Sequence, residues 1–169
     1  AFCYEGSLKQ KNYRVRSVEH LEAELNYVFT HHPVKYIIFV DDTFTLRRKR
    51  LQKITQLLKK FREKYDFIWF CEAHVRSVLA YQPEFKDMMK AGLYRVQLGI
   101  ESGDDKTLYY YRKKTNREMI IKAVELLTNS DDNYCNIIGN FILGGPFEND
   151  SSINASIELA QKLLKLAPG

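Results

Sequence analysis

Several apolar stretches of the sequence are each followed by residues that could bind a small polar ligand. Carboxylates accept hydrogen bonds from sugar hydroxyls and pair with ammonium groups, while glycines let a flat ring approach the backbone. A histidine adds a donor or acceptor near neutral pH. The four endings carry Asp41 and Asp42, then Glu72 and His74, then Glu101 and Ser102, and finally Gly144 and Gly145. The pattern indicates one ligand site assembled from four separate segments.

The acidic pair also has a simpler interpretation. Asp42, Thr43 or Thr45 could cap the helical segment that follows, because short oxygen-bearing side chains accept hydrogen bonds from the first N–H groups of a helix. One such ending would be unremarkable. Four endings on one sheet edge favour a ligand site, because the carboxyl ends of parallel strands host the chemistry in parallel barrels.

The segments before these endings have the composition of strands. Residues 36–40 are five consecutive apolar or aromatic residues, which is typical of a strand buried on both faces of a parallel sheet. Similar runs occupy 66–74, 93–100 and 136–143. Helical patterns lie before, between and after the strands, and we expect Ser17, Thr45 and Asn116 to cap three of them, Pro83 to open a short one, and 153–164 to form the last.

This order of elements predicts an α/β fold. Strand–helix units of this length form right-handed crossovers that place strands parallel and helices outside. We therefore expect a partial (β/α) barrel with four parallel strands and outer helices, in a single domain over 1–169. Because the pattern begins and ends on a helix, we expect a section of a larger barrel with a strand missing on each side. Its open sheet edges would favour self-association.

Composition and charge limit the cellular compartment and the kinds of partner that the protein can have. The chain has 169 residues, a net charge of +5 and no apolar run of membrane-spanning length. Its three cysteines, Cys3, Cys71 and Cys135, are far apart, which argues against a disulfide framework and predicts a cytoplasmic protein. We expect Cys71 and Cys135 to be buried packing residues. Many of the positive charges lie in 47–64, where a solvated helix face is the favoured interpretation over a nucleic-acid contact.

Cys3 lies in a loop upstream of the first helix, on the expected ligand edge. Iron–sulfur clusters need several thiolates that converge from a short loop. This loop offers one, so the chain cannot complete a cluster site alone.

Four motifs together resemble the radical S-adenosylmethionine (radical SAM) superfamily, in family order and spacing. That family has a Cys-x3-Cys-x2-Cys cluster loop with an aromatic residue before its last cysteine, and Phe2-Cys3 resembles its final two positions. The other three motifs resemble the segments that accept the amino group of SAM, contact its ribose and lie beside its adenine, and they occupy 40–45, 98–103 and 140–148 respectively.

The resemblance implies the core of an enzyme that reductively cleaves SAM at a 4Fe-4S cluster and generates a 5′-deoxyadenosyl radical. Cys3 is the implied metal ligand. The first two cluster cysteines and the last strand lie outside this chain, so we expect the chain by itself to be inactive. The implied cofactor-binding residues are Phe2, Asp41, Asp42, Thr43, Glu72, His74, Glu101, Ser102, Ile142, Gly144 and Gly145.

The sequence departs from the family pattern at one strand end. Relatives often have Glu-Ala-Arg-Val-Asp where 72–76 is Glu-Ala-His-Val-Arg, so His74 replaces the usual arginine. The Asp-Thr pair at 42–43 is common among members with an upstream cobalamin-binding domain, and we expect that subgroup. Two alternatives remain open: an α/β nucleotide-binding module without redox chemistry, and an RNA-modifying relative that uses the basic helix. The substrate is not predicted.

Overall fold

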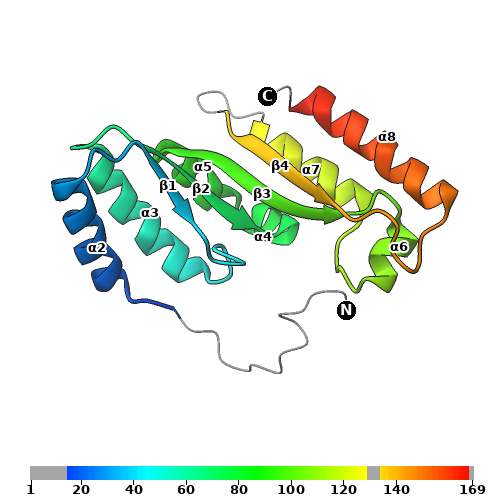
Figure 1. The fold of residues 1–169 in the computed structure, drawn as a ribbon, viewed down its shortest axis with the longest axis horizontal. Coiled ribbons are helices and arrows are strands. Elements are labelled where there is room, and N and C mark those ends of the chain that lie inside the picture. The colour runs from blue at the N-terminus through cyan, green and yellow to red at the C-terminus, as the bar shows by residue number, and fades with distance from the viewer. Residues whose placement is uncertain (1–14, 129–133, 168–169) are drawn as a thin grey trace.

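The protein forms one four-stranded parallel sheet in the order β1-β2-β3-β4, with helices in the crossovers (Figure 1). This computed structural model describes residues 15–128 and 134–167. The predicted α/β fold with four parallel strands is confirmed. The elements are α2 (Val18–His31), β1 (Tyr36–Phe39), α3 (Arg48–Arg62), β2 (Ile68–Ala73), α4 (Val75–Ala80), α5 (Gln82–Lys90), β3 (Leu93–Glu101), α6 (Asp105–Tyr110), α7 (Arg117–Thr128), β4 (Asn136–Phe141) and α8 (Asp150–Leu166).

The register of the strands separates two faces of the sheet. Phe39 pairs with Cys71, Cys71 with Val96, and Val96 with Ile137, so these four residues form one row across the sheet. Side chains in such a row point to the same face. Cys71 and Val96 are fully buried, which identifies this face as the one covered by the helices.

Aromatic packing holds β1 and β2 to the helices on the covered face. Trp69 is fully buried, and its indole N–H donates to the Ala91 carbonyl at 2.8 Å. The Phe39 ring lies edge-on to the Trp69 ring, with the ring centroids 5.6 Å apart. The Phe44 ring also packs against Trp69, with the centroids 5.7 Å apart. Cys71 and Cys135 are both fully buried, which confirms the prediction that they pack in the core.

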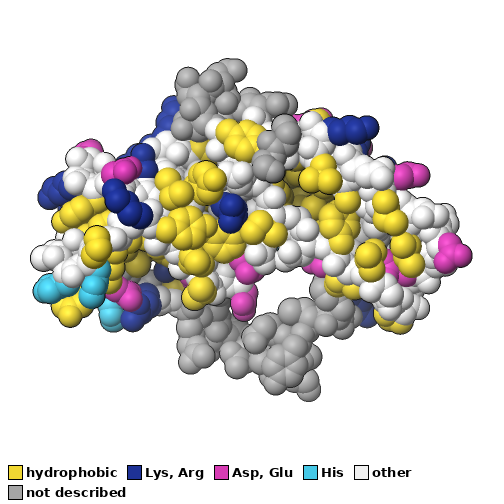
Figure 2. All heavy atoms as spheres, turned by 45° about the horizontal axis from the view of Figure 1, so that its top comes forward, with side chains coloured by type: hydrophobic (Ala, Val, Ile, Leu, Met, Phe, Trp, Pro, Cys, Tyr) yellow, Lys and Arg dark blue, Asp and Glu magenta, His cyan; other side chains and the backbone are white. Residues whose placement is uncertain are grey.

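The prediction that 36–40 is buried on both faces is wrong. Ile38 is 55% exposed and Val40 is 85% exposed, because the helices cover only the face that carries Phe39. Ile38 pairs with Phe70, and Phe70 with Arg95, so these residues form a row on the uncovered face. Figure 2 shows hydrophobic side chains gathered across the middle of the molecule around a basic group. An uncovered apolar face is expected of a sheet that forms part of a barrel wall.

Two of the three predicted helix caps are confirmed. The Ser17 side chain accepts from the N–H of His20, and Asn116 Oδ1 accepts from the N–H of Met119 at 2.9 Å. Thr45 does not cap α3, which begins three residues later at Arg48. Thr45 is instead buried in the turn after β1, and its hydroxyl makes no hydrogen bond to any described residue. The turn accounts for the difference, because it inserts residues between the acidic pair and the helix.

Two short helices, α4 and α6, were not predicted. His74 caps α4 by accepting from the N–H of Arg76, and Asp104 caps α6 by accepting from the N–H of Thr107. Each helix has 6 residues, too few for an apolar period to be recognisable in the sequence. Each helix begins within a few residues of a strand end, and its capping residue lies near the carboxyl edge of the sheet.

The sheet has two edges in the part of the chain that the structure describes. β1 pairs only with β2, and β4 only with β3. Unpaired edges of this kind can add a further strand, and self-association through them remains a prediction. Among the described residues no helix is both long and apolar enough to span a membrane.

Candidate functional site

The carboxyl ends of β1, β2 and β3 lie along one edge of the sheet and carry most of the predicted site residues. Asp41, Asp42 and Thr43 follow β1 in a turn. This turn is tied to the end of β2, because the N–H of Phe44 donates to the Glu72 carbonyl at 3.2 Å. The β1 end and the β3 end are separated by about 10 Å, two strand spacings. The predicted acidic residues therefore flank one stretch of edge wide enough for a small ligand.

Glu101 ends β3 in a strained conformation. Its φ is 69°, in the left-handed region that costs a residue with a side chain about 1–3 kcal/mol. The strand is irregular here, since the register with β4 shifts between Gly99 and Glu101. The Glu101 carbonyl accepts from the N–H of Ile142 at 2.9 Å, which fixes the distorted backbone to the segment after β4. Backbone strain of this type often marks a functional position.

A buried ion pair occupies the end of β3. Lys113 Nζ donates to Glu101 Oε1 at 2.6 Å, and the two side chains are only 14% and 11% exposed. Gly99 makes room for the pair, because a Cβ at this position would lie 2.6 Å from Glu101 Oε1 and 2.7 Å from Lys113 Nζ. The strand thus has a glycine where a positive and a negative group meet over its backbone.

A second carboxylate lies on the neighbouring strand. Glu72 and Gln97 are paired across β2 and β3, and Gln97 Nε2 donates to Glu72 Oε1 at 3.2 Å. Both side chains are half-buried. The amide orients the carboxylate and leaves its second oxygen available to a ligand.

His74 is a neutral donor at this edge. Its Nδ1 accepts from the N–H of Arg76 at 3.1 Å, so in the neutral ring the proton resides on Nε2. Burial and, to a smaller extent, the positive charges of Lys113 and Arg76 together lower the pKa of His74 to about 4. The imidazole is therefore uncharged at neutral pH, unlike the arginine that relatives often have here.

The glycine-rich segment after β4 is the fourth part of the edge. Gly144 has a φ of 80°, which a residue with a side chain rarely adopts. A Cβ at Gly145 would overlap the hydroxyl of Tyr111, and the Gly145 N–H donates to Glu148 Oε2 at 2.7 Å. Ile142, half-buried, precedes the glycines. The segment can present exposed backbone to a flat group.

Ser102 has a structural role that the sequence did not indicate. It is fully buried, and its hydroxyl lies 3.1 Å from the Ser156 hydroxyl on α8. Ser156 also accepts from the N–H of Gly103 at 2.8 Å, so the two serines fasten the end of β3 to α8. A contact between Ser102 and a ligand remains a prediction. Phe2 and Cys3 lie outside the described residues.

Sequence reasoning missed Gln97 and Lys113. Gln97 is a polar residue within a strand, and its alternation with Val96 and Leu98 was the available signal. Lys113 follows Glu101 by twelve positions, with a helix between them. Helix or strand periodicity does not relate residues at this separation, so the pair could not be predicted from the sequence and is seen only in the folded structure.

Three basic residues of α3 form ion pairs with neighbouring helices. Arg48 donates to the buried Glu84 of α5 at 2.7 Å. Lys59 pairs with Asp87 of α5, and Lys60 pairs with Glu22 of α2. These ion pairs support the interpretation of the charge run as a structural helix surface.

The described residues contain no cluster of three or more His, Cys, Asp or Glu side chains that could hold a metal ion. Cys71 lies on the covered face of the sheet, and burial raises the pKa of its thiol well above the ordinary value. Burial likewise raises the pKa of Cys135 to about 12. Both thiols are buried in the core and are not exposed to a ligand.

A parallel sheet with polar groups and a buried ion pair along the carboxyl ends of its strands is typical of the wall of a (β/α) barrel. The family model of the radical SAM superfamily matches residues 1–160, and the chain belongs to that superfamily. The resemblance seen in the sequence is therefore confirmed.

Curated relatives are similar over most of this chain. An uncharacterized methyltransferase of Pyrococcus horikoshii is 31% identical over 162 residues, 96% of this chain and 34% of the relative. The anaerobic magnesium-protoporphyrin IX monomethyl ester cyclase of Rubrivivax gelatinosus is 25% identical over 151 residues, 89% of this chain and 26% of the relative. The chain thus spans about a third or less of the length of these proteins.

Solved structures share the fold. The cobalamin-dependent S-adenosylmethionine radical enzyme OxsB, with aqua-cobalamin and S-adenosylmethionine bound, superposes with a TM-score of 0.73 at 20% identity, over 86% of this chain and 22% of OxsB. Coproporphyrinogen III oxidase HemN from Escherichia coli, a radical SAM enzyme, gives 0.68 at 16% identity, over 86% of this chain and 34% of HemN. At these identities the likeness concerns the fold.

Proposed function

We propose that the chain is the SAM-binding part of a radical SAM enzyme. The observation that carries this proposal is the buried pair of Glu101 and Lys113 at the carboxyl edge of the sheet. Taking two charges out of water costs several kcal/mol per ion, and their mutual attraction offsets this cost fully only when further hydrogen bonds satisfy the remaining donors and acceptors. A zwitterionic ligand that carries an ammonium and a carboxylate offers each of them a partner.

The charges and hydrogen-bonding groups along the edge match the parts of SAM. Lys113 supplies a cation for the methionyl carboxylate, and Asp41 or Asp42 supplies an anion for the ammonium group. Glu101 accepts from the ribose hydroxyls once Lys113 turns to the carboxylate. His74 donates through Nε2 without adding charge. The cofactor supplies the cleavage of the carbon–sulfur bond, and the protein binds and orients the molecule that undergoes it.

The adenine of SAM would lie against the glycine-rich segment after β4. The exposed backbone of Gly144 can approach a flat ring, and Ile142 offers an apolar contact at its side. Phe2 is proposed as a second apolar contact on the basis of the sequence.

The cysteines of this chain do not fit a complete 4Fe-4S site. Such a site needs three thiolates that converge from one loop. Cys3 is the proposed ligand, while Cys71 and Cys135 are fully buried in the core, Cys71 on the face of the sheet that the helices cover. The cluster of the enzyme would therefore depend on thiolates that this chain does not supply.

The relatives support proposals for the kind of substrate and for a second cofactor. The likeness to OxsB supports the proposed subgroup that carries a cobalamin-binding domain upstream. The relatives named as a methyltransferase and a cyclase support an enzyme that modifies an organic substrate.

Substitution of Glu101 tests the proposed SAM site. We expect Glu101→Gln, in the full-length protein that contains this chain, to weaken SAM binding about ten- to a hundredfold, the effect of losing a charge-assisted hydrogen bond. Glu63→Gln is the matched control, because Glu63 is an exposed glutamate at the end of α3. Isothermal calorimetry gives both affinities. Equal SAM affinities in the two variants would refute the assignment of Glu101.

A further inference from the structure

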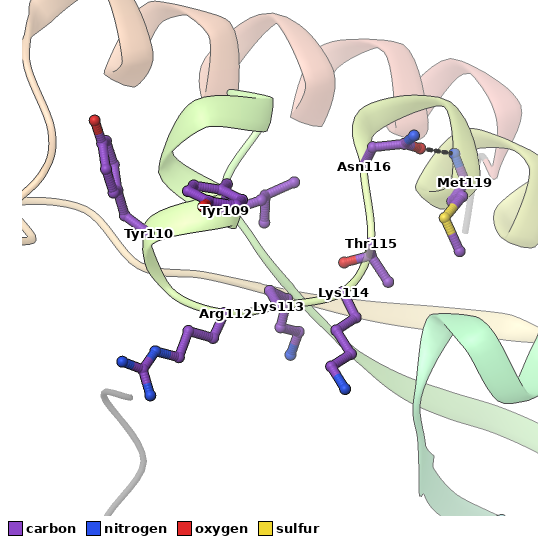
Figure 3. Close-up of a pocket in the computed structure, with 9 residues that line it drawn as sticks. Tyr109, Tyr110, Arg112, Lys113, Lys114, Thr115, Asn116 and Met119 are labelled. Carbon is purple, nitrogen blue, oxygen red and sulfur yellow. Dashed lines mark hydrogen bonds between the residues drawn. The ribbon is translucent and has the colours of Figure 1, made fainter.

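A groove between α6 and α7 is not explained by SAM binding. It encloses about 740 Å³ and is lined chiefly by Leu108, Tyr109, Arg112, Lys114, Thr115 and Met119. Figure 3 shows Tyr109 projecting from α6, while Arg112, Lys113 and Lys114 extend together from the loop that joins the two helices. Lys113 also lines the groove, so the groove opens beside the Glu101–Lys113 pair.

Exposed aromatic rings form one wall of this region. Tyr109 is 79% exposed, and its ring lies 5.9 Å from that of Tyr110. Tyr110 in turn stacks on Phe147, with ring centroids 5.1 Å apart. A single exposed aromatic residue is ordinary, but a contiguous exposed group at the rim of a groove is typical of a binding surface.

The charge of the groove is positive and uncompensated. Within the part of the chain that the structure describes, Arg112 and Lys114 form no ion pair, and no acidic side chain lines the groove. The charge of Lys113 is balanced by Glu101. Two cations beside exposed aromatic rings suit a ligand that is both flat and anionic.

The position of Arg112 is a third, independent observation. Its φ is 57°, in the left-handed region, and it follows Tyr111, the C-cap of α6. The Arg112 N–H donates to the Tyr109 carbonyl and the Lys113 N–H to the Leu108 carbonyl, both at 2.9 Å. These two bonds define a Schellman motif, in which the residue at the Arg112 position is usually glycine. An arginine in this conformation carries a conformational cost, which points to a use for its side chain.

We propose that this groove binds a planar aromatic group that carries carboxylate, phosphate or sulfonate substituents. Tyr109 stacks on the ring, and Arg112 and Lys114 pair with the anionic substituents. Because the groove shares Lys113 with the SAM site, the bound group is a portion of the substrate, and this last assignment rests on the proposed function. Binding of a planar anionic ring in the groove does not depend on the proposed function.

Titration with pyrene-1,3,6,8-tetrasulfonate, followed by fluorescence anisotropy, tests the groove. We expect Tyr109→Ala to weaken binding about tenfold, the usual effect of losing one stacking ring. Tyr27→Ala, at an exposed tyrosine on α2, should leave the affinity unchanged. Equal losses in the two variants would overturn the proposal, and so would binding no tighter than that of inorganic phosphate.

Arg112→Gly separates binding from folding. We expect it to weaken binding of the tetrasulfonate about threefold or more, as for loss of an exposed charge pair. It should also raise Tm by about 2 °C, because glycine relieves the left-handed strain. Lys122→Gln removes an exposed charge on α7 outside the groove and should change neither value. Unchanged probe affinity in Arg112→Gly would contradict a role for this cation.

Two further measurements identify the kind of ligand. An oligouridylate that binds more than about tenfold tighter than uridine monophosphate would assign the surface to nucleic acid and overturn the small-ligand proposal. SAM affinity of the unsubstituted protein is measured in parallel. Binding of the probe without binding of SAM defeats the proposed function and leaves the groove, whereas binding of SAM without the probe defeats only the groove.

Discussion

Removing either partner of the Glu101–Lys113 pair should destabilise the protein far more than removing both. Glu101→Gln leaves the Lys113 ammonium buried beside a neutral amide, and Lys113→Met leaves the Glu101 carboxylate without its cation. Each single variant strands one charge in a site where the side chains are 14% or less exposed. The double variant strands none.

The magnitude follows from the burial of the pair. Leaving one charge of a buried pair uncompensated costs about 3–5 kcal/mol, while replacing both partners by neutral groups of similar volume is often nearly neutral. We therefore expect a coupling free energy of about 3 kcal/mol between Glu101 and Lys113. Lys59 and Asp87 form a pair at a similar distance, 2.8 Å, but are 40% and 54% exposed. Their coupling should stay below about 1 kcal/mol.

Urea unfolding at pH 7, followed by circular dichroism, measures both double-mutant cycles. The free energy of unfolding of the wild type, the single variants and the double variant gives the coupling for each pair. A coupling for Glu101 and Lys113 as small as that of Lys59 and Asp87 would show that the buried charges are stabilised by water. The buried pair would then give no support to a zwitterionic ligand at this site.

Two other predictions concern protonation and cluster assembly. Because the pKa of His74 is lowered to about 4 from 6.5, the unfolded chain binds the proton more readily, and stability should fall between pH 6.5 and pH 4. Because the ring is part-exposed, we expect the free energy of unfolding to fall by only about 1–2 kcal/mol over this range, as measured by urea unfolding. His74→Asn keeps a capping oxygen and should abolish this pH dependence. An identical loss in the variant would show that His74 is not its source. Anaerobic reconstitution of this chain with iron and sulfide should not yield a stable 4Fe-4S cluster, since it offers a single suitable thiolate; near-stoichiometric loading that disappears in Cys3→Ala would contradict this.

Local periodicity predicted the main elements because each long helix and strand is specified within its own segment. Ser17 and Asn116 cap their helices because the hydrogen bond spans only three residues. The apolar run at 36–40 identified β1 but not its exposed face, because burial depends on which layers cover the sheet. Thr45 failed as a cap because an intervening turn cannot be told from a helix start by composition alone.

The positions of the candidate residues along one sheet edge could be predicted from the sequence, but the contact between Glu101 and Lys113 could not. Parallel topology placed Asp41, Glu72 and Glu101 on one edge, which follows from the order of elements. The left-handed backbone of Glu101 and its pairing with Lys113 arise from a strand irregularity and a helix between the two residues. Such contacts are tertiary and have no sequence period.

The strand order β1-β2-β3-β4 is also the order of synthesis. Each new strand and its helix can therefore dock on the unit that emerged before it, without waiting for a distant part of the chain and without being inserted between two strands already paired. Loop closure is then limited to neighbouring units, which keeps its entropic cost low. Growth by addition at one edge, as in a stacked repeat array, would let β1 and β2 pair while the later strands are still on the ribosome.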